Sequence, residues 1–145
     1  MELPDDIYEQ IEILSEAGNE ACDDGDFDVA IHQWQQALSL LPEPADQWEA
    51  YMWLSASIGD AHYQSEDYES AKSSLYDALN GPDGQANGFV HYMMGKTLLR
   101  LDDDKAVDHL LKAYMAEGAD IFESDEEEGP ATLKLLQDRK LIDQA

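Results

Sequence analysis

Histidine, cysteine and aspartate are among the residue types in this sequence that could bind a metal or act as nucleophiles. The 145-residue chain has one cysteine, Cys22, and four histidines, His32, His62, His91 and His109. No histidines have a metal-ligand spacing such as HExxH, and a single cysteine offers no second thiolate. The run DDGDFD at 23–28 is similar to a calcium loop, but its glycine is misplaced and no glutamate closes a twelve-residue loop. These patterns predict packed or rim histidines, a small filler cysteine and an acidic turn.

Other signatures of catalysis are absent from the sequence. It has no glycine-rich phosphate loop and no GxSxG elbow. Carboxylates are so frequent that no single pair indicates an acid–base dyad. We therefore predict that the protein is not an enzyme and that it has no catalytic residue, no cofactor and no metal.

Charge is unevenly distributed along the chain. Asp and Glu number 33 against 8 Lys and Arg, for a formal net charge of -25. All eight basic residues lie at or beyond Lys72, so residues 1–71 carry 18 carboxylates and no Lys or Arg. This field opposes direct binding to nucleic acid or to an anionic membrane, and neither is expected as a partner. The partner that the charge favours is a basic protein.

The N-terminus and the cysteine content indicate a reducing compartment. The first six residues, MELPDD, lack the basic and apolar regions of a secretory signal. No apolar run approaches the ~20 residues that a spanning helix needs, and one cysteine cannot form a disulfide framework. We expect a soluble, cytoplasmic protein. The sequence leaves the oligomeric state open, with a monomer favoured.

Three segments repeat one pattern of glycine, alanine, a large residue and alanine. They are Gly18, Ala30, Trp34 and Ala37; Gly59, Ala71, Leu75 and Ala78; and Gly95, Ala106, Leu110 and Ala113. Glycine inside a helix is less favourable than alanine by about 1 kcal/mol, so its recurrence indicates that a second helix crosses too closely for a Cβ. The two alanines of each set lie two turns apart on one stripe. This small–large–small stripe is expected to nest against the thin part of a neighbouring helix.

Apolar residues recur with helical period in six long segments, and no segment shows the sustained alternation of a strand. The predicted helices are 5–23, 27–41, 45–65, 68–80, 86–101 and 103–118, with Asp46 as the cap of the third. Pro130 and the leucines after it predict a C-terminal helix that covers the last hairpin. Residues 125–129 are expected to form a solvated acidic loop. The predicted fold class is all-α.

These residues resemble the tetratricopeptide repeat (TPR) family, because the glycine, alanine, large and alanine positions fall in register three times over about residues 11–118. The resemblance implies a right-handed α-solenoid of three helical hairpins plus a C-terminal capping helix, in a single domain over 1–145. The repeats would span about 5–44, 45–85 and 86–118, and the cap 119–145. Gly18 and Gly59 are 41 residues apart rather than the family's usual 34, which implies a longer third helix or connection.

A narrower resemblance is to a group of short bacterial TPR proteins. It rests on LLKAYMAEG at 110–118 with IFE at 121–123, and on LPEP at 41–44 with QWEA at 47–50. Members of that group are often encoded beside contact-dependent polymorphic toxins and are suspected immunity proteins. The resemblance therefore implies an immunity protein that binds and neutralises a basic cognate toxin domain.

In TPR proteins the first helices of the hairpins line a concave groove. The partner-binding residues that the resemblance implies here are Glu12, Glu16, Asn19, Asp23, Trp53, Asp60, Tyr63, Gln64 and Tyr92. The same register also includes Ser15, Ala56, Ser57, Phe89, Met93, Lys96 and Arg100. The groove would be an acidic mouth that grades into aromatic walls, with two cations at its far end. Trp53 is the expected anchor, with packing in the core as its alternative.

Many eukaryotic TPR cochaperones hold the C-terminal carboxylate of heat-shock chaperones with Lys, Asn and Arg side chains. Asn19 stands at one such position, but the neighbouring clamp sites hold Ser15, Ser57, Phe89 and Met93. The acids of the groove would also repel an acidic tail, so this specialisation is not expected. Three hypotheses remain: an immunity protein, a TPR adaptor or assembly chaperone that binds a peptide in its groove, and a protein whose acidity serves solubility alone.

Overall fold

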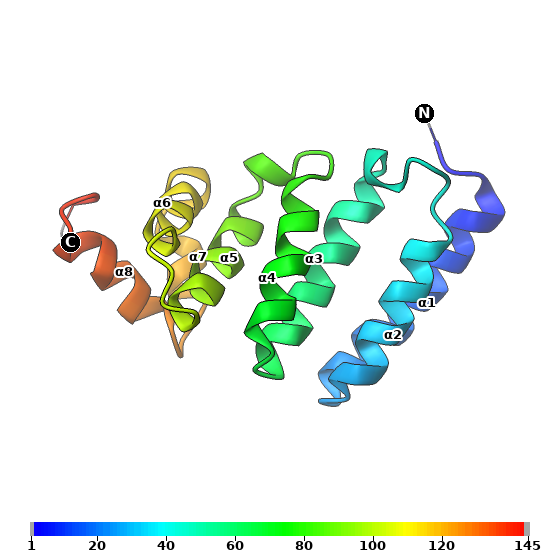
Figure 1. Cartoon of the computed structure of the whole chain (residues 1–145), viewed down its shortest axis with the longest axis horizontal. Coiled ribbons are helices and arrows are strands. Elements are labelled where there is room, and N and C mark those ends of the chain that lie inside the picture. The colour runs from blue at the N-terminus through cyan, green and yellow to red at the C-terminus, as the bar shows by residue number, and fades with distance from the viewer. Residues whose placement is uncertain (1, 144–145) are drawn as a thin grey trace. The chain divides into compact units, whose positions relative to one another are not determined.

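The computed structural model of the chain describes residues 2–143, and within that range it is all-α, with no strand. The chain divides into two compact units, residues 1–84 and 85–145. Unit 1 contains α1 (Asp5–Asp23), α2 (Phe27–Ser39), the 3-10 helix η1 (Ala45–Gln47), α3 (Glu49–Gln64) and α4 (Tyr68–Leu79) (Figure 1). Unit 2 contains α5 (Gly88–Arg100), α6 (Ala106–Glu117), α7 (Asp120–Glu123) and α8 (Gly129–Asp138). A second 3-10 helix, η2 (Gly84–Ala86), spans the boundary in the sequence.

Each of the three hairpins closes with the same left-handed turn. The residues with positive φ are Gly25 (81°), Glu66 (66°) and Asp102 (55°), at equivalent places in the repeats. In the first turn the next backbone N–H, that of Asp26, donates to the Ala21 carbonyl over 2.8 Å. The same bond recurs in the second and third turns, each over 2.9 Å. This Schellman geometry satisfies a carbonyl at the end of the first helix and reverses the chain.

The repeated glycines lie where the two helices of a hairpin cross. A Cβ on Gly59 would lie 2.7 Å from Leu75 Cγ, and a Cβ on Gly95 would lie 2.6 Å from Leu110 Cγ. In the first hairpin the equivalent glycine is covered by the Trp34 indole. Contacts this short cannot accommodate a Cβ unless the neighbouring side chain shifts. The predicted close crossing is therefore confirmed in all three repeats.

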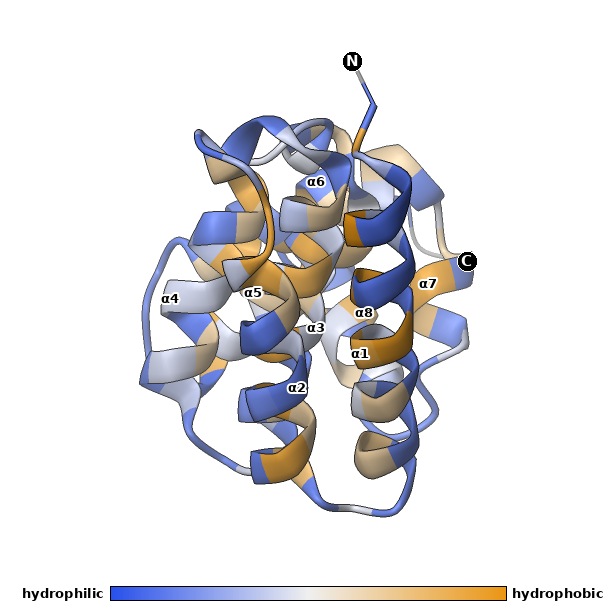
Figure 2. Cartoon of the chain, turned by 90° about the vertical axis from the view of Figure 1, so that its right-hand side faces the viewer, coloured by the Kyte–Doolittle hydropathy of each residue, from blue (hydrophilic) through white to orange (hydrophobic). Residues whose placement is uncertain are grey.

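One core cluster of unit 1 is formed by the inward stripes of α1, α2 and α3. Its fully buried members include Ala30, Ala37, Leu54 and Ala61. The Trp34 indole, 3% exposed, donates to a carbonyl of α1 over 3.3 Å, so its N–H is satisfied inside the core. Figure 2 shows both hydrophobic and hydrophilic residues along α1 and α2, as expected of helices that bury one face.

The third helix begins at Glu49 rather than at residue 45. Residues 45–47 form η1, and Trp48 then adopts an extended backbone with ψ of 140°. The indole N–H of Trp48 donates to the Pro42 carbonyl over 2.8 Å, and this buried side chain holds the connection as a separate turn. The prediction that Asp46 caps the helix is therefore wrong, because Asp46 lies within η1. The other predicted helix limits lie within about three residues of the observed ones.

Unit 2 is a third hairpin whose last helix is covered. α5 packs against α6, and α7 and α8 pack against α6 in turn. Their side chains form one core of Tyr92, Leu110, Ala113, Phe122 and Leu136. A proline stands in the first turn of α8, as predicted, where its missing N–H leaves no helical hydrogen bond unmade. The C-terminal helix therefore covers the hairpin, as the sequence predicted.

Candidate protein-binding site

The first helices of unit 1, α1 and α3, carry two series of side chains outside the packing stripe. The series are Tyr8, Glu12, Glu16, Asn19 and Asp23 on α1, and Glu49, Trp53, Ser57, Asp60 and Gln64 on α3. Both advance in steps of 4, 4, 3 and 4 residues, so each follows one face of its helix. All are exposed except Ser57 and Asp60, which are half-buried. These ten residues are called the first-helix face below.

A pocket of about 680 Å³ lies where α1 and α3 begin. It is lined by Glu2, Leu3, Tyr8, Gln47, Trp48, Glu49, Ala50 and Trp53, and is called the Trp53 pocket. Two of its aromatic rings remain accessible, since Trp53 is 40% exposed and Tyr8 is 53% exposed. The third, Trp48, is nearly buried and is held by its hydrogen bond to the η1 connection. Trp53 thus lies at the surface rather than in the core.

Carboxylates surround the Trp53 pocket. Glu2 and Glu49 are among its lining residues. On α1, the Glu12 carboxylate raises the pKa of the Tyr8 hydroxyl through a side-chain hydrogen bond and through its charge. Unit 1 as a whole has 20 Asp and Glu residues against one Lys, Lys72, and no Arg. The field at the pocket is therefore negative, and a positively charged group is the ligand that it favours.

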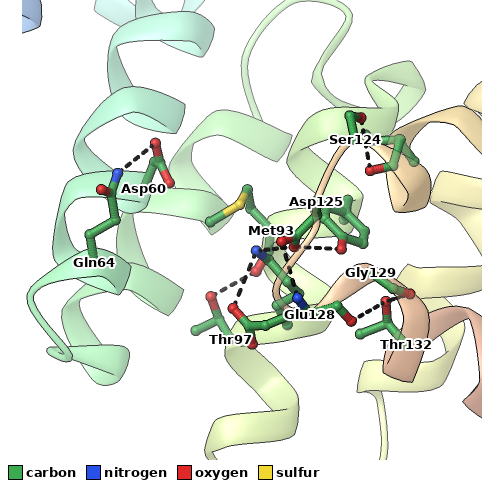
Figure 3. A network of polar contacts seen from close by, with 12 residues as sticks. Asp60, Gln64, Met93, Thr97, Ser124, Asp125, Glu128, Gly129 and Thr132 are labelled. Atoms are coloured by element: carbon green, nitrogen blue, oxygen red, sulfur yellow. Dashed lines mark hydrogen bonds and ion pairs between the residues drawn. The ribbon is translucent and has the colours of Figure 1, made fainter. Parts of the chain in front are cut away.

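At the opposite end of the first-helix face, the side chains of Asp23, Asp60 and Gln64 lie near Cys22. Gln64 Nε2 donates to Asp60 Oδ2 over 3.1 Å (Figure 3) and lies 4.0 Å from the Cys22 sulfur. Burial, followed by the charges of Asp60 and Asp23, raises the pKa of the Cys22 thiol. The thiol therefore stays protonated and weakly nucleophilic at neutral pH. This position suits the small filler that the sequence predicted.

The residues predicted for unit 1 fall into three groups on α1 and α3. Asp23, Asp60 and Gln64 come together at the Cys22 end. Glu12 lies one turn from Tyr8 at the pocket end, as its effect on the tyrosine shows. The remaining exposed side chains, Glu16 and Asn19, lie between the two ends on α1. The structure therefore places most of the predicted residues on two series of helical turns, one on α1 and one on α3.

Tyr63 lies outside the first-helix face. It is 8% exposed and packs edge-on against Tyr68, with ring centroids 5.3 Å apart. Tyr68 is the first residue of α4, so this contact closes the hairpin turn and does not offer a ring to a partner. Ser15 and Ala56, which the groove register included, are buried as well.

In unit 2 the chain's own acidic loop contacts three of the predicted groove residues, Tyr92, Lys96 and Arg100. The Tyr92 hydroxyl donates to Asp125 over 2.7 Å, and Lys96 Nζ donates to the same carboxylate over 2.8 Å. Glu128 lies 3.5 Å from Lys96 and accepts from Arg100 over 3.1 Å (Figure 3). The prediction of a solvated loop is therefore wrong at both carboxylates, because two cations on α5 attract them. Tyr92, 3% exposed, is not accessible to a partner in this structure.

The same contacts shift the pKa values of Tyr92 and Asp125. Burial, with the hydrogen bond to Asp125, raises the pKa of the Tyr92 hydroxyl. Burial also opposes the charged form of Asp125, but hydrogen bonds from Lys96 and Tyr92 outweigh it and lower the pKa of that carboxyl. At neutral pH Asp125 is therefore an anion, and Tyr92 is a neutral donor.

A second polar cluster of unit 2 is a pair of stacked histidines. His91 is 2% exposed, with its Nδ1 3.0 Å from Nδ1 of His109 and its Nε2 2.7 Å from the Gln85 carbonyl. Because a carbonyl can only accept, we assign the proton of His91 to Nε2, and His109 then donates to His91 Nδ1. Burial, followed by the charges of His91 and Lys112, lowers the pKa of His109 to about 4. These two histidines are packing residues, as predicted.

Residues 2–143 hold no group of three His, Cys, Asp or Glu side chains that could bind a metal ion. None of the helices in that range combines the length and the apolar composition that crossing a bilayer requires.

Sequence reasoning missed the Trp53 pocket, although a signal for two of its members was present. The series on α1 extends one turn backwards from Glu12 to Tyr8, and the series on α3 extends one turn backwards from Trp53 to Glu49. Trp48 had no such signal, because the predicted helix ran through it and the break before α3 depends on its contact with Pro42.

Comparison with known proteins identifies the fold. No family model matches the sequence, and no curated protein matches it. Among solved structures, the chain is similar to the "First TPR of Spaghetti (RPAP3) bound to HSP90 peptide SRMEEVD", with a TM-score of 0.69 and 15% identity. The alignment covers 92% of this chain and 98% of that chain. The chain therefore has a TPR-like all-α fold, which is typical of modules for protein–protein interaction.

Proposed function

We propose that the protein binds a basic protein through the first-helix face of unit 1, and that it acts in the cytoplasm as an immunity protein. Its ligand in this proposal is a basic toxin domain, which it neutralises by covering the cationic surface that the toxin uses. The protein itself catalyses no reaction. Trp53 is the anchor of the complex, and Glu12, Glu16, Asn19 and Asp23 supply the polar part of the surface.

The observation that carries this proposal is an exposed tryptophan in a pocket of an almost purely acidic unit. Tryptophan is enriched at the centres of protein interfaces, where its large ring contributes most when a partner covers it. Trp53 is 40% exposed, and the unit around it has 20 carboxylates against one Lys. Acidity for solubility alone would not require this ring to be exposed beside the carboxylates.

The charge supports a role in capture. A toxin that acts on nucleic acid presents a cationic cleft, since its substrate is a polyanion. Carboxylates spaced along α1 and α3 oppose that cleft in sign, and such complementarity accelerates encounter toward about 10⁸–10⁹ M⁻¹s⁻¹ at low salt. The aromatic pocket would then slow dissociation, because interface contacts act mainly on the off-rate.

The direct test is neutralisation of a toxin domain in cells. The domain to use is the variable C-terminal domain of a large secreted protein encoded beside this chain, expressed with and without the protein. We expect growth arrest by the domain alone and growth when wild-type protein is co-expressed. Trp53→Leu should relieve the arrest less, while Tyr76→Leu, at another exposed aromatic on α4, should relieve it as well as wild type. Arrest that persists beside folded wild-type protein would contradict the proposal.

The part played by charge is tested by association kinetics with the same domain. Reversal of Glu12, Glu16 and Asp23 to Lys should lower the on-rate about tenfold or more at low salt and change the off-rate much less. The matched control reverses Asp28, Glu43 and Glu69, which are exposed carboxylates of unit 1 outside α1 and α3. Equal on-rates for the two triple variants would show that the position of the acids is irrelevant.

A TPR adaptor or assembly chaperone is the second candidate. It is favoured by the fold neighbour, which is described as bound to the HSP90 peptide SRMEEVD. An adaptor would bind a short segment of its partner with micromolar affinity and lose it on Trp53→Ala, without neutralising any toxin. Peptide binding together with failure in the growth experiment would therefore select this candidate over the immunity protein.

A further inference from the structure

We propose that the Trp53 pocket accepts the guanidinium of an arginine from the basic partner, placed against the exposed aromatic rings and paired with the carboxylates of Glu2 and Glu49. This deepens the proposed function and rests on it, since it assigns the chemistry of the residue that enters the pocket. The composition of the pocket and an equivalent arrangement of side chains elsewhere in the same chain support this assignment.

The equivalent arrangement is in unit 2, where the cation is the chain's own. Lys96 Nζ lies 5.0 Å from the centroid of the Tyr92 ring. The same ammonium lies 2.8 Å from a carboxylate oxygen of Asp125 and 3.5 Å from one of Glu128. One aromatic ring and two carboxylates therefore surround one cation. Such a set satisfies a positive charge that has left water, through the ring face and through charge-assisted hydrogen bonds.

The Trp53 pocket has the same components without the cation. Its lining includes the rings of Tyr8 and Trp53 and the carboxylates of Glu2 and Glu49, and it contains no Lys or Arg. Ring and carboxylate stand one turn apart on each helix, as Tyr8 with Glu12 on α1 and as Trp53 with Glu49 on α3. A Lys or Arg side chain for this pocket must come from outside residues 1–71, which have neither.

Arginine fits this pocket better than lysine does. Its planar guanidinium can stack on an indole while its edge donates two parallel hydrogen bonds to a carboxylate. An ammonium offers a compact, strongly hydrated charge that cannot stack in this way. The Trp53 indole N–H is a further donor, and a backbone carbonyl beside the arginine could accept that hydrogen bond.

The test uses the full chain, labelled with ¹⁵N, and three blocked peptides that differ at one side chain. The probes are Gly-Gly-Arg-Gly-Gly and its lysine and citrulline versions, because citrulline keeps the shape of arginine without the charge. We expect the arginine peptide to shift the Trp53 indole resonance in a saturable way, the lysine peptide to bind more weakly and the citrulline peptide not to bind. Equal binding of citrulline and arginine, or shifts that avoid the pocket, would overturn the proposal.

Single variants then identify which side chains bind the arginine peptide. Binding to each variant is followed through the NMR shifts of the backbone amides of residues 47–50. Trp53→Leu keeps an apolar side chain but removes the ring, and it should weaken arginine-peptide binding about tenfold. Glu49→Gln should weaken it as well and should reduce the preference for arginine over citrulline. Tyr76→Leu, which removes an exposed aromatic ring from α4, should bind as wild type does. Unchanged binding in both pocket variants would overturn the proposal.

The toxin-domain experiment separates this inference from the function on which it rests. If a basic domain is neutralised and both pocket variants bind it as wild type does, the arginine site is wrong and the proposed function stands. If the arginine peptide binds as expected but no basic domain is bound, the arginine site stands and the proposed function is wrong.

Discussion

Lys96 shows how unit 2 accommodates a buried positive charge. A buried ammonium is unfavourable unless opposite charges and hydrogen bonds surround it. Here Asp125 and Glu128 supply the charges, and the Tyr92 ring lies beside them. Because both carboxylates belong to the segment before α8, this one side chain fastens the C-terminal part of unit 2 to α5.

Removal of that charge should destabilise the protein. Lys96→Met keeps most of the aliphatic stem but leaves Asp125 with only the Tyr92 hydroxyl and the Glu128 backbone N–H as donors. We expect a loss of about 2 kcal/mol in unfolding free energy, since both carboxylates are partly exposed. Urea denaturation at pH 7 measures it. Lys134→Met is the control, because its pair with Asp138 is exposed and should contribute less than about 1 kcal/mol. Equal losses in the two variants would contradict the role given to Lys96.

The histidine pair predicts a pH dependence of stability. The folded-state pKa of His109 is lowered to about 4, whereas the unfolded chain has the ordinary value near 6.5. Between these values the unfolded state binds a proton that the folded state does not, so the unfolding free energy should fall as pH drops from about 6.5 to 4. His109→Asn keeps a donor for His91 Nδ1 without this titration, and its urea midpoints should depend less on pH in that window. Variant His32→Asn, at an exposed position, is the control. Parallel wild-type and His109→Asn curves would contradict the prediction.

At the scale of the element, the hairpin turn is the most regular feature of the chain. All three repeats place one residue in the left-handed region and follow it with the same backbone hydrogen bond. Glycine occupies that position in the first turn, at Gly25, whereas the second and third turns use Glu66 and Asp102. A side chain in this region costs about 1–2 kcal/mol relative to glycine, so the later turns carry a strain that the first does not.

Adding a side chain at the first turn and removing one at the second should therefore change the unfolding free energy in opposite directions. Gly25→Ala should lower the unfolding free energy by about 1 kcal/mol, and the reason is backbone conformation alone, because a Cβ there would meet nothing within 4 Å. Glu66→Gly should raise it by up to about 1 kcal/mol, and Glu66→Gln separates the loss of charge from the relief of strain. Chemical denaturation of the three variants measures both effects. A stabilising Gly25→Ala would disprove the assignment of this turn.

At the scale of the whole molecule, charge is the dominant property. The net charge of -25 is concentrated in unit 1, whose 20 carboxylates face one Lys, while unit 2 has seven of the eight basic residues. Like charges held together on folding repel one another and lower the stability of the compact state. The same concentration is what the proposed function uses to attract a basic protein.

Screening should therefore stabilise the free protein and weaken its complex. Raising NaCl from 20 to 500 mM shortens the Debye length from roughly 20 Å to about 4 Å, and we expect the melting temperature to rise by about 3–4 °C, the shift that about 1 kcal/mol produces at this length. The triple variant Glu12→Gln, Glu16→Gln, Asp23→Asn should melt higher at low salt and respond less to NaCl. A melting temperature that falls with added NaCl would show that attractive pairs outweigh the repulsion.

Much of the fold could be predicted, and less of the site. The glycine positions at 18, 59 and 95 and the alanine stripes revealed the hairpins, because both reflect local contacts that recur at a fixed distance in sequence. The break before α3 could not be predicted, since it depends on how the Trp48 ring is buried against Pro42. The predicted face of α1 and α3 is on the surface, but its pocket includes residues that lie outside the predicted repeat positions.

Sequence alone determined that the chain is all-helical, where its hairpins cross and that its first unit is strongly acidic, because helical period, residue size and charge are properties of short segments. Tertiary structure decided which aromatic rings are accessible. Register placed Trp53, Tyr63 and Tyr92 on the same predicted surface, yet Trp53 is exposed, while Tyr63 packs on Tyr68 and Tyr92 binds Asp125. The physical reason is that helical period assigns a face, whereas burial depends on what another part of the chain brings to that face.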